Sequence, residues 1–252
     1  MLSRNELEAI MSLKRLSIIQ VEKDYLQNLL LYTIYSVVGR ELIFKGGTCL
    51  YKVYGLNRFS EDLDFSVAKY FDFEKLLKKI LYVAAQSGAY GKVKTFEKYQ
   101  NQLNINLEFK GSLYTGNPKS MCFIGLDISM REKPFLSPEK QILHPSYRDI
   151  PEFDVFVMDL KEILAEKIAA VYSRKKPRDV YDIWFLLKFK KIQIDLDLLR
   201  KKLKKQKIFF DKNTFLSKIQ EKESGWKSDL AALVAGELSS FAQVEKEIEE
   251  RI

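Results

Sequence analysis

The sequence predicts an α+β protein, in which helices flank a mixed β-sheet and a helical C-terminal part follows. Between residues 42 and 130, short apolar or alternating stretches typical of strands are interspersed with helical patterns. From about residue 157 onward, apolar side chains recur only at helical spacing. This change predicts two domains, at residues 1–156 and 157–252.

Each expected element follows from the spacing of its apolar side chains. A helix repeats them every three to four positions, whereas a half-buried strand alternates them. Residues 131–156 contain four prolines, and we expect a loop-rich segment there. In order, we expect helices within 3–38, a strand at 42–44, a helix at 48–54, a strand at 63–67, a helix at 73–86, strands at 92–99, 103–109 and 122–130, and helices from residue 159 onward.

Composition excludes several classes of protein. The chain of 252 residues can bury a sizeable core, and 46% hydrophobic residues is ordinary for a globular protein. The apolar run near residues 29–38 is too short and polar to span a membrane, and we expect a cytoplasmic protein without a signal peptide. One histidine, His144, and two scattered cysteines make a zinc site or a Ser-His-Asp hydrolase unexpected. Cys49 and Cys122 lie in apolar stretches and are expected to be buried thiols. The net charge of +8 suits RNA or DNA as a partner but does not require one.

The most informative stretch runs from Phe44 to Phe65. A Gly46-Gly47-Thr48 turn is followed by Asp62 and Asp64, whose side chains point to the same side of a strand. Neighbouring carboxylates are tolerated when a cation lies between them, and Mg²⁺ is often held by one or two carboxylates plus substrate phosphates. Glycines at a helix start leave backbone N–H groups open to phosphate. The stretch therefore predicts metal-assisted chemistry on a nucleotide.

The sequence leaves two possible roles for each of three further residues. The Thr48 hydroxyl is able either to cap the helix or to bind a phosphate oxygen, and Lys45 either meets phosphate or is solvated. Asp127 alternates with apolar residues on a later strand. If that strand lies beside Asp62 and Asp64, three carboxylates converge on a metal that activates an attacking hydroxyl. Otherwise Asp127 is a solvated residue on a half-exposed strand.

A charged cluster lies in the helical part. Lys167 and Arg174 are seven residues apart on an expected helix, and Asp182 lies one turn beyond Asp179 on the next. A Lys and an Arg that face a nucleotide would bind its triphosphate. The alternative is a network of salt bridges between helices. The basic run at residues 200–207 is either a solvated helix face or an RNA contact.

Four motifs in combination resemble the AbiEii/AbiGii family of nucleotidyltransferase-like proteins, the toxins of type IV toxin–antitoxin and abortive-infection systems. The likeness covers about residues 20–240. That family in turn resembles nucleotidyltransferases of the polymerase-β type, which implies a nucleotidyltransferase-like sheet. The motifs are Phe-Lys-Gly-Gly-Thr-Cys-Leu from Phe44, Arg-Phe-Ser-Glu-Asp-Leu-Asp-Phe from Arg58, Leu-Asp-Ile-Ser from Leu126, and Glu-Ile-Leu-Ala-Glu-Lys from Glu162 with Arg-Lys-Lys-Pro-Arg-Asp-Val-Tyr-Asp-Ile-Trp from Arg174.

The resemblance implies a role for each candidate residue. The turn would bind phosphate, and the acidic pair would bind metal. Asp127 would be the third carboxylate and the base. Lys167 would contact the nucleotide, and Asp182 would be catalytic or positioning. The expected catalytic residues are Asp62, Asp64, Asp127, Lys167 and Asp182, with the three sheet carboxylates as metal ligands, and the expected nucleotide-binding residues are Lys45, Gly46, Gly47, Thr48 and Arg174.

The expected function is Mg²⁺-dependent transfer of a nucleotide from an NTP to an acceptor hydroxyl. The resemblance implies RNA as the acceptor, in particular a tRNA 3′ end, a toxin role in phage defence, and a cognate antitoxin as partner. Two alternatives stay open. One is a nucleotidyltransferase-like protein that binds NTP or RNA without transfer, and the other is a basic interaction module with a structural acidic pair.

Overall fold

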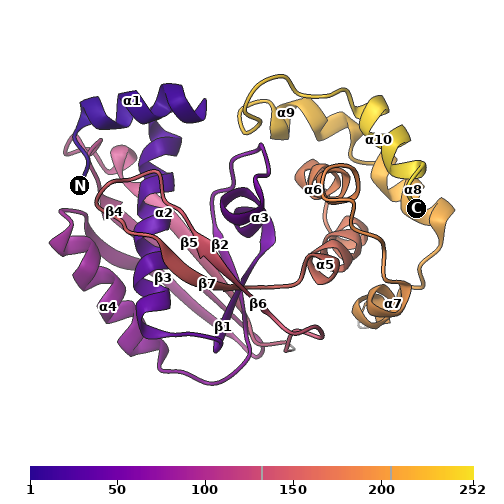
Figure 1. Ribbon diagram of the computed structural model, residues 1–252, viewed down its shortest axis with the longest axis horizontal. Helices are drawn as coiled ribbons and strands as arrows, with labels where there is room; N and C mark the ends of the chain where they lie inside the picture. Colours follow the sequence, from indigo (N-terminus) through magenta and orange to yellow (C-terminus); the bar gives the residue numbers. More distant parts are fainter. Residues whose placement is uncertain (132, 205) are drawn as a thin grey trace. The chain divides into compact units, whose positions relative to one another are not determined.

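The computed structural model describes residues 1–131, 133–204 and 206–252 (Figure 1). Their contacts group the chain into two compact units, each described here by itself. The prediction of two domains at 1–156 and 157–252 concerns independent folding and stays a prediction. The sheet unit comprises residues 1–55, 59–134 and 138–157, and the helical unit comprises residues 56–58, 135–137 and 158–252.

The sheet unit is built on a seven-stranded sheet in the order β3-β4-β5-β2-β1-β7-β6. The pairs β2–β5 and β1–β7 are parallel, and the remaining neighbours are antiparallel. The sheet is therefore mixed, as predicted. The strands are β1 (Leu42–Lys45), β2 (Leu63–Val67), β3 (Tyr90–Tyr99), β4 (Gln102–Lys110), β5 (Cys122–Ser129), β6 (Glu139–Leu143) and β7 (Phe153–Val157).

Alternation along β4 and β5 gives this part of the sheet one apolar and one polar face. Phe44, Phe65, Ile128 and Leu103 are paired in register across four strands, and all four are buried. Burying such side chains supplies most of the favourable free energy of folding. Helices α2 (Ile18–Val37) and α4 (Phe73–Gln86) contact each other and neighbouring strands (Figure 1). The polar residues between the apolar ones then project from the opposite face.

The N-terminal helices begin and end where local chemistry dictates. Ser3 with Glu6, and Ser17 with Gln20, form capping boxes that satisfy the first backbone N–H groups of α1 (Arg4–Lys14) and of α2. The chain turns between these helices at Arg15, whose φ is 55°. The next helix, α3 (Gly46–Tyr54), begins at the two glycines and ends at Gly55. All three helices fall where the sequence predicts them.

The expected loop at residues 131–156 is wrong in part. It contains β6 and β7, and β7 lies parallel to β1 through the pairing of Phe44 with Val157. Pro138 and Pro151 stand just outside these strands, where a missing backbone donor interrupts no ladder. The prolines therefore mark the strand borders, and each strand is only five residues long, too short for a clear alternating signal.

In the described part of the helical unit, the regular elements are helices and one short 3-10 turn, with one isolated bridge between Arg58 and Val234. One helix begins at Pro177, and proline is favoured there because the first helical position needs no backbone donor. No described helix is long and apolar enough to cross a membrane. Of the basic run at 200–207, Lys205 lies outside the described residues. The helices are α5 (Leu160–Ser173), α6 (Pro177–Lys188), α7 (Leu196–Lys204), α8 (Lys212–Gln220), α9 (Trp226–Leu230) and α10 (Phe241–Glu249).

Candidate active site

A row of polar side chains crosses the sheet in register. Lys45 pairs with Asp64, Asp64 with Asp127, Asp127 with Asn104, and Asn104 with Glu97. Directly paired residues project to the same side of a sheet, so these side chains share the polar face. The strand adjacency on which a third carboxylate depends is therefore present. Two carboxylates opposite each other repel unless a cation or donors compensate them.

The Gly-Gly turn lies against the Asp64 carboxylate. Gly46 has a φ of 74°, a conformation that favours glycine. A Cβ at Gly46 would lie 2.2 Å from Asp64 Oδ2 and 2.9 Å from Asp64 Cβ. Only a residue without a side chain therefore allows the carboxylate to lie where it does. The sequence predicted these glycines as a phosphate-binding turn, and the structure adds this second reason for Gly46.

The Asp62 segment is held from two sides. The Thr48 hydroxyl, which is buried, donates a hydrogen bond to the backbone carbonyl of Asp62. The backbone N–H of Gly125 donates to Asp62 Oδ1 at 3.2 Å. A Cβ at Gly125 would lie 2.7 Å from the same oxygen. The Thr48 hydroxyl proton is thus used to position Asp62, so any phosphate contact by Thr48 is left to its backbone N–H.

The first turn of α3 presents backbone donors. Its N-cap residue, Lys45, makes no side-chain hydrogen bond to these N–H groups. Such a helix start suits an anion because the N–H groups and the helix dipole both favour negative charge. Cys49, the fourth residue of this helix, is fully buried. Burial and the nearby Asp64 carboxylate raise the pKa of the Cys49 thiol well above its usual value, so Cys49 stays a neutral core residue.

A buried charge cluster fixes α3 to the N-terminal helices. Asp24 accepts from Lys14 and Lys52 at 2.6 Å each, and the Tyr147 hydroxyl donates to it at 2.6 Å. Burial alone would raise the pKa of Asp24, but the Lys52 and Lys14 ammonium groups outweigh it and lower the pKa to about 2. Because Lys52 lies on α3, the cluster sets the position of the helix that carries the Gly-Gly turn.

The donor set on the sheet fits a hard divalent cation. Carboxylate oxygens from Asp62, Asp64 and Asp127 are the ligand type that Mg²⁺ prefers. The glycines at positions 46 and 125 leave room for the Asp64 and Asp62 carboxylates on this face. Within the part of the chain that the structure describes, no three His, Cys, Asp or Glu side chains are gathered as metal ligands would be. One reason is that Asp62 is turned toward the Gly125 N–H.

The helical unit holds a second charged cluster. The Lys167 ammonium lies 2.8 Å from Asp179 and 2.8 Å from Asp182. Arg58 binds Asp182 through two hydrogen bonds of 2.7 and 2.6 Å. Burial would lower the pKa of Lys167, but the Asp179 and Asp182 carboxylates outweigh it and raise the pKa. Lys167 is therefore protonated at neutral pH. This geometry is a salt-bridge network between helices, and nucleotide binding by the same residues stays a prediction.

Two further features of this cluster bear on the predicted site. Helix α5 ends at Ser173, so Arg174 lies beyond it in extended conformation and is exposed, rather than on one helix face with Lys167. Among the described residues, Asp179 Oδ2 is buried without a hydrogen-bond partner. Buried polar atoms are nearly always paired, so an unpaired carboxylate oxygen is unusual.

Sequence reasoning missed Arg58. It belongs to the helical unit, although the residues on either side of its short segment belong to the sheet unit. Its side chain is among the largest that are fully buried. An Arg at the start of the acidic motif gives no sign, by spacing alone, that its partner lies 124 residues away. No signal in the sequence singled it out, because Arg174, Lys175, Lys176 and Arg178 stand near Asp182 as alternative cations.

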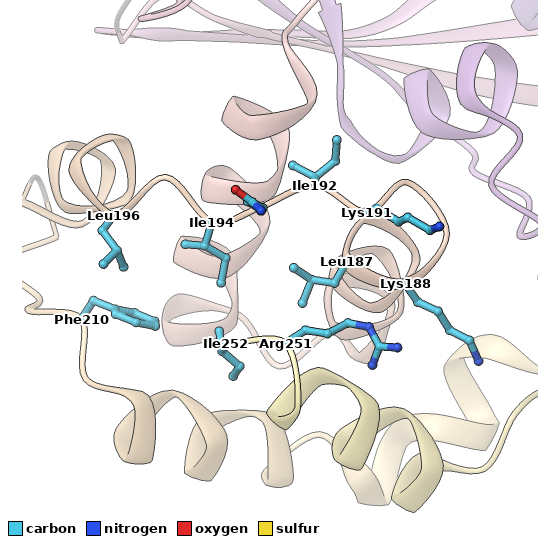
Figure 2. Close-up of a pocket in the computed structure, with 10 residues that line it drawn as sticks. Leu187, Lys188, Lys191, Ile192, Ile194, Leu196, Phe210, Arg251 and Ile252 are labelled. Atoms are coloured by element: carbon cyan, nitrogen blue, oxygen red, sulfur yellow. The ribbon is translucent and has the colours of Figure 1, made fainter.

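A cavity of about 540 Å³ also lies in the helical unit (Figure 2). It is lined mainly by apolar side chains such as Leu187, Ile194 and Phe210, with Lys188 and Arg251 also in the lining. None of its ten lining residues is Asp or Glu. It therefore lacks the carboxylates that metal-assisted transfer requires, and the polar face of the sheet is the better candidate for the chemistry.

Comparison with solved structures shows which known proteins share the fold. The chain is similar to MenT4, the nucleotidyltransferase toxin Rv2826c from Mycobacterium tuberculosis H37Rv, with 19% identity, a TM-score of 0.68, and coverage of 100% of this chain and 88% of that chain. It is also similar to JHP933 from Helicobacter pylori, with 22% identity, a TM-score of 0.62, and coverage of 94% and 91%. No curated protein matches the chain. At such identities the likeness concerns the fold alone, which the chain shares with MenT4 and JHP933.

A match between the sequence and a protein-family model identifies the family. The model described as nucleotidyl transferase AbiEii toxin, type IV TA system, matches residues 29–247. The chain therefore belongs to the AbiEii family of nucleotidyltransferase toxins, and the predicted resemblance is confirmed. Membership implies an enzyme that uses a nucleotide as substrate and that is paired with a cognate antitoxin.

Proposed function

We propose that the polar face of the sheet transfers a nucleotide from an NTP to a hydroxyl of an RNA acceptor. The observation that carries this proposal is the registered pair of Asp64 and Asp127 beside the Gly46 turn. It combines hard oxygen ligands with a helix start suited to phosphate. A tRNA 3′ end as the acceptor, a cytoplasmic location and a part in phage defence belong to the same proposal, on the ground of family membership.

The proposed reaction is an in-line displacement at the α-phosphorus. The acceptor oxygen forms the new bond to phosphorus, and the bond to the pyrophosphate oxygen breaks. Asp127 accepts the proton of the attacking hydroxyl, and pyrophosphate leaves with the electron pair. Asp62 and Asp64 would hold Mg²⁺, with Asp127 as the third carboxylate. When bound, this ion neutralises charge on the phosphates.

The turn at the start of α3 is the proposed triphosphate site. Backbone N–H groups of Gly46, Gly47 and Thr48 point from the first helical turn, where anions are stabilised by about 0.3–1 kcal/mol even at exposed sites. Lys45 precedes them and shares the row with Asp64. Its ammonium group is the proposed cation for a phosphate oxygen. Placing a nucleotide phosphate beside the Asp64 carboxylate requires such compensation of charge.

For the helical cluster taken by itself, family membership supports a proposed role in binding phosphate. An ammonium group has three donors, and two ion pairs account for two of those on Lys167. The third is available for a phosphate oxygen. In this proposal Asp182 positions Lys167 and Arg58, and exposed Arg174 contacts phosphate.

The activity itself is tested by incubating the protein with each labelled NTP, total RNA and Mg²⁺, with and without a chelator. We expect one or more NTPs to label a defined RNA species, and the chelator to abolish labelling. Saturable NTP binding without labelling would instead indicate a nucleotidyltransferase-like binding protein. Absence of both NTP and metal binding would contradict the proposal and favour a basic interaction module.

A further inference from the structure

A basic groove lies on the sheet near its β3 edge. It has a volume of about 860 Å³, and its lining comes from β3, β4, β5 and the segment that joins β4 to β5. Four lysines and one glutamate line it, so its charge is strongly positive. We call it the lysine groove. The lysines are Lys92, Lys94, Lys110 and Lys119, and the aromatic lining residues are Tyr90, Tyr114 and Phe123.

The lysine groove shares the polar face with the carboxylates. Phe123 pairs with Glu108, and Glu108 with Lys92, in a row across β5, β4 and β3. Phe123, Gly125 and Asp127 alternate along β5 and therefore project to the same side. Four residues of strand correspond to about 13 Å, so the groove begins about 13 Å from Asp127 along one strand. Asp62, bound to the Gly125 N–H, lies between these two rows.

Two ammonium groups lie close to aromatic rings within the groove. Lys94 falls at a register shift between Val93 and Thr95, and its ammonium lies 4.2 Å from the centre of the Phe123 ring. A bulge of this kind re-aims a side chain. Lys110 lies 5.3 Å from the centre of the Tyr114 ring. Tyr90 is 66% exposed, so its ring face is accessible to a ligand.

Protection of an edge strand does not explain this composition. Lysines on an edge strand such as β3 prevent pairing with other chains. That role would account for Lys92 and Lys94 but not for Lys110 on β4 or Lys119 in the connecting segment. Glu108 is neutralised by Lys92 at 3.1 Å, which leaves the remaining lysines to set the charge of the groove.

We propose that the lysine groove binds the single-stranded end of an RNA and directs its terminal hydroxyl toward Asp127. Single strands are bound by a cationic track for the phosphates together with aromatic rings on which bases stack. The groove supplies both. This inference rests on the proposed nucleotidyl transfer, and it identifies the part of the sheet unit that holds the acceptor.

The test measures RNA binding separately from transfer. Wild type and a triple variant are each titrated into a short fluorescent single-stranded RNA with a 3′ hydroxyl, in the absence of NTP. The triple variant combines Lys94→Ala, Lys110→Ala and Lys119→Ala. The matched control is Lys75→Ala, Lys78→Ala, Lys79→Ala, which removes the same charge from exposed positions on α4. We expect the groove variant to lose at least about tenfold in affinity and the control to change little. The slope of log K against log salt should fall by about 2, because each phosphate contact contributes about 0.7.

A second variant tests stacking. Tyr90→Ala should weaken binding by about fivefold or more without changing the salt slope, since stacking is worth about 1–3 kcal/mol per base. Equal losses in the groove and control variants, or no loss in either, would overturn the inference. So would equal binding of a polyglutamate peptide of the same charge.

Failure of the inference and failure of the proposed function are distinguishable. Groove-dependent RNA binding without any nucleotide transfer would reject the proposed function and retain an RNA groove. Normal transfer to RNA by the groove variant would reject the groove and retain the proposed function. Loss of transfer with unchanged NTP binding in the groove variant is the result that we expect.

Discussion

The close approach of Gly46 to Asp64 makes a sharp prediction. In Gly46→Ala, the added Cβ would lie 2.2 Å from Asp64 Oδ2. Separation of these atoms to at least 3.0 Å requires a shift of about 0.8 Å, and Asp64 Cβ, at 2.9 Å, prevents simple rotation of the carboxylate from relieving all of it. A displacement of about 1 Å at a reacting group lowers a rate by about 100-fold. We therefore expect about that loss in nucleotide transfer.

Gly55→Ala is the matched control. Gly55 has a φ of 75°, almost that of Gly46, but a Cβ there would meet no atom within 4 Å. Both variants should lose about 1–2 kcal/mol in unfolding free energy, because a left-handed backbone is unfavourable for alanine. Gly46→Ala should lose additional stability from the steric overlap.

The assay pairs urea denaturation with the initial rate of label transfer from NTP to RNA. If the two variants transfer at the same rate, the contact between the turn and Asp64 has no catalytic importance and the reasoning is refuted. If Gly46→Ala is too unstable to assay, both glycine variants are compared with wild type at lower temperature, where NTP binding is measured directly.

Three further predictions follow. Thr48→Val should lower the free energy of unfolding by about 1–2 kcal/mol, because the Asp62 carbonyl loses its hydroxyl donor. Thr48→Ser keeps the hydroxyl and should have the stability of wild type. Equal stabilities of the Val and Ser variants would argue against this hydrogen bond. The pKa of Asp24 is lowered from 3.8 to about 2, so Asp24 contributes about 2 kcal/mol of stability that is present above pH 4 and lost as the pH falls toward 2. Acid titration of Asp24→Asn, followed by circular dichroism, should not show this loss of stability. At pH 7 the variant should be about 3–5 kcal/mol less stable than wild type. A variant as stable as wild type would contradict the stabilising role of the Asp24 ion pairs. Cys49 and Cys122 are buried and unpaired with each other, and burial raises the pKa of the Cys122 thiol to about 12. A thiol reagent at pH 8 should therefore label the native protein far more slowly than the unfolded protein. Rapid labelling of the native protein would contradict this burial.

Local patterns accounted for much of the fold and for the residues on the sheet. Alternation in residues 122–130 and 103–109 predicted β5 and β4, because one face of each strand packs on the core. The pairing of Asp64 with Asp127 was expected only on the condition that their strands are neighbours. Strand order depends on contacts between distant segments, which spacing within one segment does not encode.

The charged groups of the helical unit were harder to predict. The sequence showed Lys167, Asp179 and Asp182 at helical spacing, and it left a binding site and a salt-bridge network as alternatives. A further member of the network, Arg58, reaches Asp182 from a segment between α3 and β2. Its role depends on which buried carboxylate lacks a cation, and burial is a property of the packed structure. The Gly46 contact with Asp64 was likewise invisible, because it depends on sub-ångström packing.

The most direct test of the central claim compares transfer rates of wild type, Asp64→Asn and Asp154→Asn over a range of Mg²⁺ concentrations. Asp154 is an exposed residue on β7 that pairs with Lys140, so it controls for loss of one negative charge. We expect Asp64→Asn to fold and to transfer nucleotide about 10³-fold more slowly, since a metal ion supplies several kcal/mol of transition-state stabilisation. Asp154→Asn should behave as wild type. Equal rates for Asp64→Asn and wild type would contradict the assignment of the sheet carboxylates as the catalytic site.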